Sequence, residues 1–403
     1  MSRVVVTGLG LVTALGSGVE KSWRGFLNGV DTASKVTLFD TSLYKTHYAC
    51  EIKNFVDETG FGSDKENNYV NKFVYSAVKE ALDSSGLQGS HDAYDRDRFG
   101  IALGTLAAEI VPFERQLKKD LSMKTNGFDA NVISVYPPNS ITNYLSEVFD
   151  LTGPSMVSLN ACSSGNHAIS WAYDMISCGN ADVMVVGGSE TINITEYTHF
   201  HNVKALAPEK CRPFDKDRSG LLIGEGAGIL ILESLDFALK RSADIYAELK
   251  GVGLSCDGFH MTAPHPEGEG AVNAMKDALL TANLSVEDID YISAHGTGTP
   301  LNDKSESLAI HTVFKERAKK IPCSSIKSMI GHSMGAASAI ESVVSCLAIR
   351  NNVVPPTINF VTIDPECEID CVPNTARDVK VRNVINNSFA FGGNNAVLIF
   401  GEM

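Results

Sequence analysis

The sequence lacks a long apolar segment and an excess of positive charge. No run approaches the roughly 20 apolar residues of a membrane-spanning helix. Its 34 Lys and Arg residues face 48 Asp and Glu residues, a formal net charge of −14. Nucleic acids and anionic membranes bind positive surfaces, so we expect the protein to bind neither. Residues 1–3 lead into a strand-like run at residues 4–10, without the pattern of a signal peptide, and we expect a cytoplasmic protein.

Paired cysteines are also missing. The nine cysteines are an odd number, and no two of them form a Cys-x-x-Cys pair. This pattern fits neither a disulfide framework nor a zinc site, and we predict no metal centre. Most of the cysteines should be small buried side chains, so any cysteine chemistry must come from the surroundings of one residue.

What is present is the composition of a globular α/β protein. The 403 residues are 44% hydrophobic and 20% charged, which excludes a disordered or fibrous chain. Short Val- and Ile-rich runs alternate with helical stretches, which predicts a largely parallel sheet covered by helices. Predicted strands are residues 4–7, 99–103, 183–186, 221–232, 245–252, 291–294 and 384–400. Predicted helices are residues 72–85, 165–177, 270–282, 304–314 and 335–349.

A weak internal repeat divides the chain into residues 1–246 and 247–403. The first strand of each part contains glycines, at residues 4–10 and 247–253. The last strand of each part is flanked by glycine, at residues 220–233 and 392–400. Each part also has a strand that runs into a small-residue turn and a helix, at residues 159–165 and 331–337. No Pro- or Ser-rich linker separates the parts, so a duplicated unit is favoured over hinged domains.

Cys162 lies between a strand-like run and the sequence Ser-Ser-Gly, which favours a turn and a helix start. Unpaired N–H groups and the helix dipole at that point favour thiolate. A thiol with a pKa of about 8.5 reaches half ionisation at neutral pH when its thiolate form is stabilised by about 2 kcal/mol. A helix terminus stabilises a negative charge by up to roughly that amount. The alternative is an inert residue in a tight corner.

Three further loops contain candidate groups. His295 lies in a Gly- and Thr-rich loop after an apolar strand, where α/β sites gather, although an ordinary turn has the same composition. A phosphate loop is disfavoured because the Gly-Lys-Ser/Thr signature is absent. His332 precedes the small-residue start of a helix, and Lys327 and Glu341 flank this segment. His332 is either a catalytic residue or a structural residue that caps the helix. Gly392 and Gly393 lie beside two phenylalanines, which fits either a backbone oxyanion donor with an aromatic gate or a simple hairpin.

In this order the motifs resemble the β-ketoacyl-(acyl carrier protein) synthases, condensing enzymes of the thiolase superfamily. The similarity is greatest to the type II elongating members and runs almost end to end. The matching segments are residues 4–10, 153–155, 160–165, 212–215, 224–228, 295–300, 327–337 and 387–395.

The resemblance implies a thiolase fold, which is a duplicated five-layer αβαβα architecture with two mixed sheets. It assigns Cys162 as the acylated nucleophile and His295 and His332 as its two catalytic histidines. Lys327 and Glu341 match a supporting ion pair. Phe391 matches a gating aromatic, and the implied substrate-binding residues are Thr297, Thr299, Thr262, Ala107, Ala108, Phe389, Gly392 and Gly393.

The implied activity is a decarboxylative Claisen condensation between an acyl-enzyme and malonyl-(acyl carrier protein). No cofactor is implied, because the substrates travel on the phosphopantetheine arm of the carrier protein. The implied assembly is a homodimer. The segment 256–268 also favours an alternative, an active ketosynthase paired with a chain-length-factor-like subunit in a type II polyketide or aryl-polyene pathway.

Two other functions are disfavoured. A non-catalytic chain-length factor typically lacks the cysteine that is present here, and a degradative thiolase has a second cysteine near the C-terminus, whereas none follows Cys371. The chain departs from the family at Asn160, Ala390 and Asn394, which indicates a reshaped pocket. Candidate cations for an acidic carrier protein are Arg115, Lys118, Lys119, Lys204 and Lys210, while the segment 65–72 is less basic than in relatives.

Overall fold

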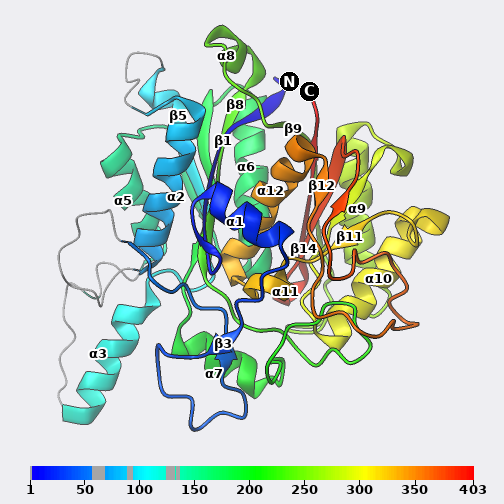
Figure 1. Ribbon diagram of the computed structural model, residues 1–403. Helices are drawn as coiled ribbons and strands as arrows, with labels where there is room; N and C mark the ends of the chain where they lie inside the picture. Colours follow the sequence, from blue (N-terminus) through cyan, green and yellow to red (C-terminus); the bar gives the residue numbers. More distant parts are fainter. Residues whose placement is uncertain (1, 57–68, 89–93, 124–131, 133–136) are drawn as a thin grey trace.

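Two sets of five strands with the same order and directions form the centre of the computed structural model (Figure 1), which describes residues 2–56, 69–88, 94–123, 132 and 137–403. In sheet order the first set is β6 (Ser155–Ser158), β5 (Phe99–Gly104), β7 (Val183–Glu190), β8 (Gly226–Ser234) and β1 (Val4–Thr13). The second set is β11 (Cys323–Ser324), β10 (Tyr291–Ser293), β14 (Asn383–Phe389), β15 (Asn394–Gly401) and β9 (Ala247–Cys256).

The pairing directions in the two sets are the same. The first three strands of each set are parallel, and the last two pairings are antiparallel. The two mixed sheets are joined at one edge, because Val4–Val6 of β1 pairs with Ala247–Leu249 of β9. The sequence did not indicate this short junction.

Helices cover and separate the two sheets in five layers (Figure 1). Helix α2 (Tyr69–Ser85) lies on β1 and β8, and α9 (Glu269–Ala282) lies on β9 and β15, with α10 (Pro300–Phe314) against α9. Between the sheets, α6 (Ser164–Ser177) packs on α12 (Met334–Asn351), and α12 contacts strands of both sets. This is the predicted αβαβα arrangement.

The central position of α12 follows from its sequence, MGAASAIESVVSCLAIRN, which is small or apolar on every face. Every side chain from Met334 to Ile349 is buried. Glycines of neighbouring elements allow the close approach: a Cβ at Gly228 of β8 would lie 2.5 Å from the backbone nitrogen of Ile340, and one at Gly165 of α6 would lie 2.8 Å from that of Ala339.

The strands predicted at residues 4–7, 183–186 and 245–252 extend further toward the C-terminus in the structure, and two other predicted strands include residues that are not strand. The segment predicted as residues 221–232 becomes a strand only at Gly226, because Leu221 and Ile223 instead make isolated bridges to Leu206 and His332. The segment predicted as residues 384–400 is two antiparallel strands. They are separated by a turn at Phe391–Gly393, where the φ angles of Gly392 and Gly393 are 79° and 74° and end the extended backbone.

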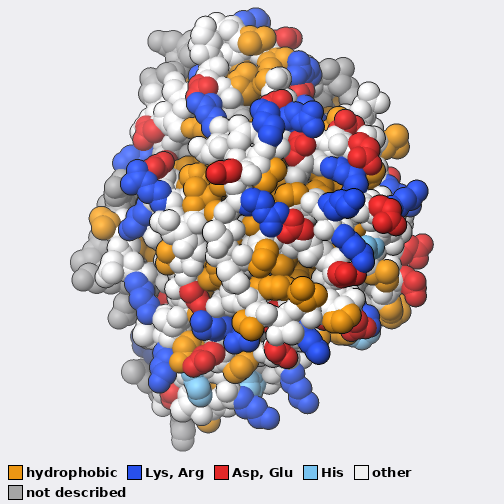
Figure 2. All heavy atoms as spheres, turned by 45° about the vertical axis from the view of Figure 1, so that its right-hand side comes forward, with side chains coloured by type: hydrophobic (Ala, Val, Ile, Leu, Met, Phe, Trp, Pro, Cys, Tyr) orange, Lys and Arg blue, Asp and Glu red, His pale blue; other side chains and the backbone are white. Residues whose placement is uncertain are grey.

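The remaining elements are short or lie at the periphery. The helices are α1 (Val19–Leu27), α3 (Ile110–Met123), α5 (Ser140–Phe149), α7 (Ile194–Asn202), α8 (Leu235–Lys240) and α11 (Lys327–Ile330). The strands are β2 (Gly16–Ser17), β3 (Ser34–Lys35), β4 (Tyr48–Ala49), β12 (Val353–Val354) and β13 (Arg377–Asp378). Within the described residues, no helix combines the length and apolar character needed to cross a membrane. Figure 2 shows positive and negative side chains interspersed over one face.

Candidate active site

A cavity of about 350 Å³ lies where loops from the two halves of the chain, residues 1–246 and 247–403, meet. Its lining includes Cys162, His295 and His332. These three residues follow β6, β10 and β11, which are parallel strands of the two sets. Phe389 at the end of β14 and Phe391 just beyond it also line this cavity. The cavity therefore lies at the carboxyl ends of strands from both halves, the usual place for an α/β site.

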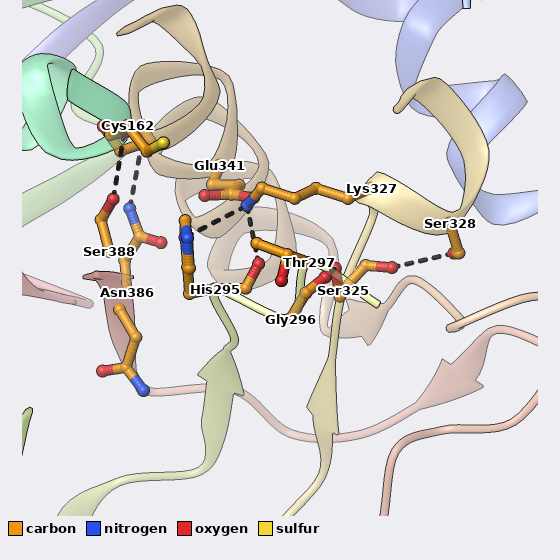
Figure 3. A network of polar contacts seen from close by, with 12 residues as sticks. Cys162, His295, Gly296, Thr297, Ser325, Lys327, Ser328, Glu341, Asn386 and Ser388 are labelled. Atoms are coloured by element: carbon orange, nitrogen blue, oxygen red, sulfur yellow. Dashed lines mark hydrogen bonds and ion pairs between the residues drawn. The ribbon is translucent and has the colours of Figure 1, made fainter. Parts of the chain in front are cut away.

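Cys162 lies in a single 3₁₀ turn, Ala161–Ser163, directly before α6. Its side chain is buried, and the Ser388 hydroxyl holds its backbone by donating to the Cys162 carbonyl at 3.2 Å (Figure 3). Burial raises the pKa of the Cys162 thiol to about 12, while the Lys327 charge and the Phe391 N–H act in the opposite direction. The sequence-based expectation of a lowered pKa is therefore not met, because desolvation outweighs the favourable groups. The resting thiol is protonated at neutral pH.

His295 is held in one orientation by Lys327 (Figure 3). The Lys327 ammonium donates to the His295 carbonyl at 2.8 Å and lies 3.5 Å from His295 Nδ1. An ammonium has no lone pair, so Nδ1 must accept and the ring proton resides on Nε2. Burial, followed by the charge of Lys327 and the nearby His332, lowers the pKa of His295 well below its usual value. His295 is therefore a neutral N–H donor.

The backbone of the His295 loop is anchored by Glu306 of α10, a residue that the sequence analysis missed. The N–H groups of His295 and Gly296 donate to the two Glu306 carboxyl oxygens at 2.8 and 2.7 Å, and the Asn387 amide donates to one of them at 3.3 Å. Asp303, one turn earlier on the same helix face, accepts from Gly298 N–H at 3.1 Å. The sequence does contain a signal for this anchor, because Asp303 and Glu306 lie three positions apart directly after the glycine-rich loop.

His332 has a fixed backbone and an unengaged ring. Its N–H donates to the Leu222 carbonyl at 2.7 Å, and its carbonyl accepts from Gly224 at 2.9 Å. Within the described residues, neither ring nitrogen has a hydrogen-bond partner, although the ring is buried. Burial and the Lys327 charge lower its pKa well below the usual value. Its ring meets that of His295 edge to face, with centroids 5.4 Å apart.

Lys327 and Glu341 form an ion pair that is shielded from water. Their side chains are 1% and 2% exposed. Burial raises the pKa of Glu341 to about 7, and the Lys327 charge limits this rise. The pair therefore places one fixed positive charge beside both imidazoles.

Replacing Lys327 by methionine is expected to lower the free energy of unfolding by about 3 kcal/mol or more, because it leaves a buried carboxyl without its partner. Loss of the positive charge raises the pKa of Glu341 further, so the folded variant retains a proton that wild type releases above pH 7. The deficit in stability should therefore grow between pH 6 and pH 8 in urea unfolding. The double variant Lys327→Met/Glu341→Gln should recover much of the loss, and a deficit independent of pH would contradict this account.

Phe391 lines one side of the cavity, whereas the predicted substrate-binding residues Gly392 and Gly393 are not among its lining residues. The Phe391 ring lies 5.7 Å from that of Phe200, centroid to centroid. Gly392 N–H donates to the Met261 carbonyl at 2.8 Å, and Gly393 N–H donates to the Ala390 carbonyl at 3.0 Å. These bonds occupy both glycine N–H groups, whereas the N–H of Phe391 faces the Cys162 sulfur.

The other predicted substrate residues divide into two groups. Thr262, Thr297, Thr299 and Phe389 line the cavity, and the hydroxyls of Thr297 and Thr299 are 2.9 Å apart. Ala107 and Ala108 are not among its lining residues; the Ala107 N–H donates to Glu190 at 3.2 Å.

The candidate carrier-binding cations lie in different places. Lys204 is exposed and lines the cavity, whereas Lys210 lies 3.6 Å from Asp31. Arg115 and Lys118 line a second cavity of about 540 Å³ beside α3, and Lys119 is exposed on the same helix. In the segment 65–72, Lys72 is buried and Lys65 lies outside the described residues.

Comparisons with known proteins show which family the chain resembles. Residues 1–238 match the family domain "Beta-ketoacyl synthase, N-terminal domain", and residues 246–361 match "Beta-ketoacyl synthase, C-terminal domain". The chain is 38% identical over 407 residues to 3-oxoacyl-[acyl-carrier-protein] synthase 2 of Staphylococcus aureus (strain COL), covering 99% of this chain and 98% of the relative.

Two solved structures are also similar over the whole chain. The ishigamide ketosynthase/chain length factor superposes with a TM-score of 0.95 at 37% identity, covering 100% of this chain and 99% of that one. A type II PKS acyl-carrier protein in complex with its ketosynthase bound to the hexaketide gives a TM-score of 0.91 at 31% identity, with the same coverage.

Proposed function

The chain belongs to the β-ketoacyl synthase family, and from this premise we propose that it is a 3-oxoacyl-(acyl carrier protein) synthase. It extends an acyl chain by two carbons through decarboxylative condensation with malonyl-(acyl carrier protein). The observation that carries the proposal is the meeting of a cysteine thiol, two neutral imidazoles and a backbone N–H in one cavity.

The first half-reaction transfers the acyl group to Cys162. The thiol sulfur attacks the thioester carbonyl, and the oxyanion that forms is stabilised by the backbone N–H groups of Cys162 and Phe391. The C–S bond to phosphopantetheine then breaks, and the thiol proton leaves with the departing sulfur. Burial raises the pKa of the thiol, so we expect proton loss to accompany sulfur attack.

The second half-reaction generates the carbon nucleophile. Malonyl-carrier protein loses CO₂, and the electron pair of the broken C–C bond moves into an enolate whose negative charge resides on the thioester oxygen. The Nε2–H of His295 and a ring N–H of His332 donate to that oxygen. Because both rings are neutral, each keeps its ring N–H proton and stabilises the developing negative charge by donating a hydrogen bond.

Carbon attack completes the cycle. The enolate carbon forms a bond to the acyl carbonyl carbon on Cys162, and the C–S bond of the acyl-enzyme breaks. The cysteine sulfur takes up one proton from solvent, which balances the negative charge of the malonyl carboxylate that left as neutral CO₂. The Lys327–Glu341 pair fixes His295 throughout and touches no reacting atom.

The carrier protein delivers both substrates. Lys204 and the paired hydroxyls of Thr297 and Thr299 line the cavity that its phosphopantetheine arm enters. The similarity to a ketosynthase/chain length factor pair supports a second possibility, that this chain is the active subunit of such a heterodimer rather than a homodimer. Purification from the native host with subunit counting by native mass spectrometry distinguishes the two assemblies.

The activity is tested with acyl- and malonyl-loaded carrier proteins. Intact-protein mass spectrometry should show one acyl group on the enzyme, mapped to Cys162, followed by a 3-oxoacyl-carrier product two carbons longer. Cleavage of 3-oxoacyl-coenzyme A by free coenzyme A, without condensation on carrier proteins, would instead indicate a degradative thiolase.

A further inference from the structure

Three aromatic rings meet at the wall of the catalytic cavity, and one of them belongs to His199, a residue that the mechanism does not use. The Phe391 ring lies 5.7 Å from that of Phe200 and 6.2 Å from that of His199, centroid to centroid. The His199 and Phe200 rings are 5.3 Å apart. Rings at these separations attract each other, so the three side chains form one packed unit.

The packed rings come from two elements that are far apart in the sequence. His199 and Phe200 are consecutive residues of α7, whereas Phe391 begins the turn between β14 and β15. Phe200 is buried and His199 is exposed, so the imidazole packs on the other two rings from the solvent side. Its ring meets that of Phe391 edge to face, with 66° between the ring planes. Helix α7 therefore supplies the surface on which the Phe391 side chain rests.

The backbone of Phe391 lies beside the nucleophile. Its N–H faces the Cys162 sulfur, and the turn Phe391–Gly393 contacts the turn Ala161–Ser163 that contains Cys162. In the proposed mechanism this N–H is one of the two donors to the oxyanion. Such a donor is most effective when it is held in place before the negative charge develops. The position of Phe391 therefore affects acyl transfer directly.

Hydrogen bonds hold the two glycines of this turn. Gly392 N–H donates to the Met261 carbonyl at 2.8 Å, and the Gly393 carbonyl accepts from the Asp257 N–H at 2.9 Å. These bonds join the turn to residues 257–261, whereas the ring contacts join it to α7. The turn is thus held from two elements, and the Phe391 side chain makes the contact with α7.

We propose that His199 is a positioning residue for acyl transfer, because its packing on Phe391 holds the Phe391 N–H toward the Cys162 sulfur. Phe200 supplies a second ring contact, so loss of the imidazole weakens the position of Phe391 without abolishing it. His199 is not among the residues that line the cavity, and it acts only through Phe391. The inference rests on the proposed function, because it concerns the transfer of an acyl group to Cys162.

The experiment measures the two half-reactions separately in His199→Ala. Single-turnover acylation of Cys162 by saturating octanoyl-carrier protein should be about 3- to 10-fold slower, the effect of losing one ring contact, with an unchanged half-saturating concentration. Decarboxylation of malonyl-carrier protein by the unacylated enzyme should change by less than about 2-fold, because the two imidazoles of the cavity stabilise the enolate. His199→Phe keeps a ring at this position and should be acylated at nearly the wild-type rate.

His201→Ala is the matched control. His201 is a histidine of the same helix, and its ring packs on that of Tyr44 at 5.1 Å, so its loss should leave both rates unchanged. A double-variant cycle tests whether His199 acts through Phe391. Phe391→Ala removes the ring and keeps the N–H, and in this background His199→Ala should cause no further loss of acylation.

The outcomes separate this inference from the proposed function. Acylation of His199→Ala at the wild-type rate, equal losses in both half-reactions, or a loss that His199→Phe does not restore overturns the role of His199 and leaves the synthase activity standing. Additive losses in the double variant overturn that role too, because His199 then does not act through Phe391. Failure of wild type to be acylated by any carrier-bound substrate overturns both claims.

Discussion

Replacing Cys162 by alanine is expected to lower the condensation rate by a factor on the order of 10⁴ to 10⁶, the usual effect of removing a covalent nucleophile. The acyl group then has no sulfur to which it can transfer, and the mass shift on the enzyme should disappear. Slow decarboxylation of malonyl-carrier protein should persist, because His295 and His332 still stabilise the enolate. Product formation and CO₂ release, measured together, report the two half-reactions separately.

The matched control is Cys178→Ala, because Cys178 is an exposed cysteine at the far end of α6 and loss of its thiol should change neither rate. The Cys162→Ala variant is expected to fold, since alanine fits a site occupied by a small buried side chain and circular dichroism should be unchanged. Condensation that continues at more than a few per cent of the wild-type rate would exclude Cys162 as the nucleophile.

Replacing His332 by alanine is expected to lower decarboxylation of malonyl-carrier protein by about 10² to 10³-fold, as when one oxyanion donor is removed. Acylation of Cys162 should fall much less, because that oxyanion is stabilised by backbone N–H groups. Single-turnover acylation, followed by mass spectrometry, and release of labelled CO₂ from malonyl-carrier protein measure the two steps.

His332→Gln should recover part of the decarboxylation rate, because its carboxamide supplies an N–H donor in a comparable volume. His311→Ala is the matched control, since His311 of α10 is not among the residues that line the cavity and its Nε2 lies 3.0 Å from the Glu368 carbonyl. Equal losses in acylation and decarboxylation for His332→Ala would contradict a role specific to the enolate.

Local patterns in the sequence predicted much of the fold. The alternation of Val- and Ile-rich runs with helices located the main strands, and the small-residue composition of residues 335–349 marked a helix that the structure places between the sheets. Errors occurred where tertiary contacts override local pattern. Residues 221–225 read as strand, yet the structure shows only isolated bridges there, from Leu221 to Leu206, from Ile223 to His332 and from Gly224 to Cys50.

The candidate site was predicted residue by residue from motifs, and its catalytic roles remain predictions. Cys162, His295, His332 and Phe391 share one cavity, whereas Ala107 and Ala108 do not line it. Glu306 was missed because its contribution is a pair of hydrogen bonds to the backbone of His295 and Gly296, and no motif records such a bond.

The sequence by itself determined which reactive groups the chain carries, because thiol, imidazole and ammonium groups are fixed by residue type, and strand and helix tendencies are local. Only the tertiary structure decided their chemical states. Burial raises the pKa of the Cys162 thiol and lowers the pKa of His295 and of His332. Desolvation and charge coupling depend on which distant segments pack together, and that information is not local to any stretch of sequence.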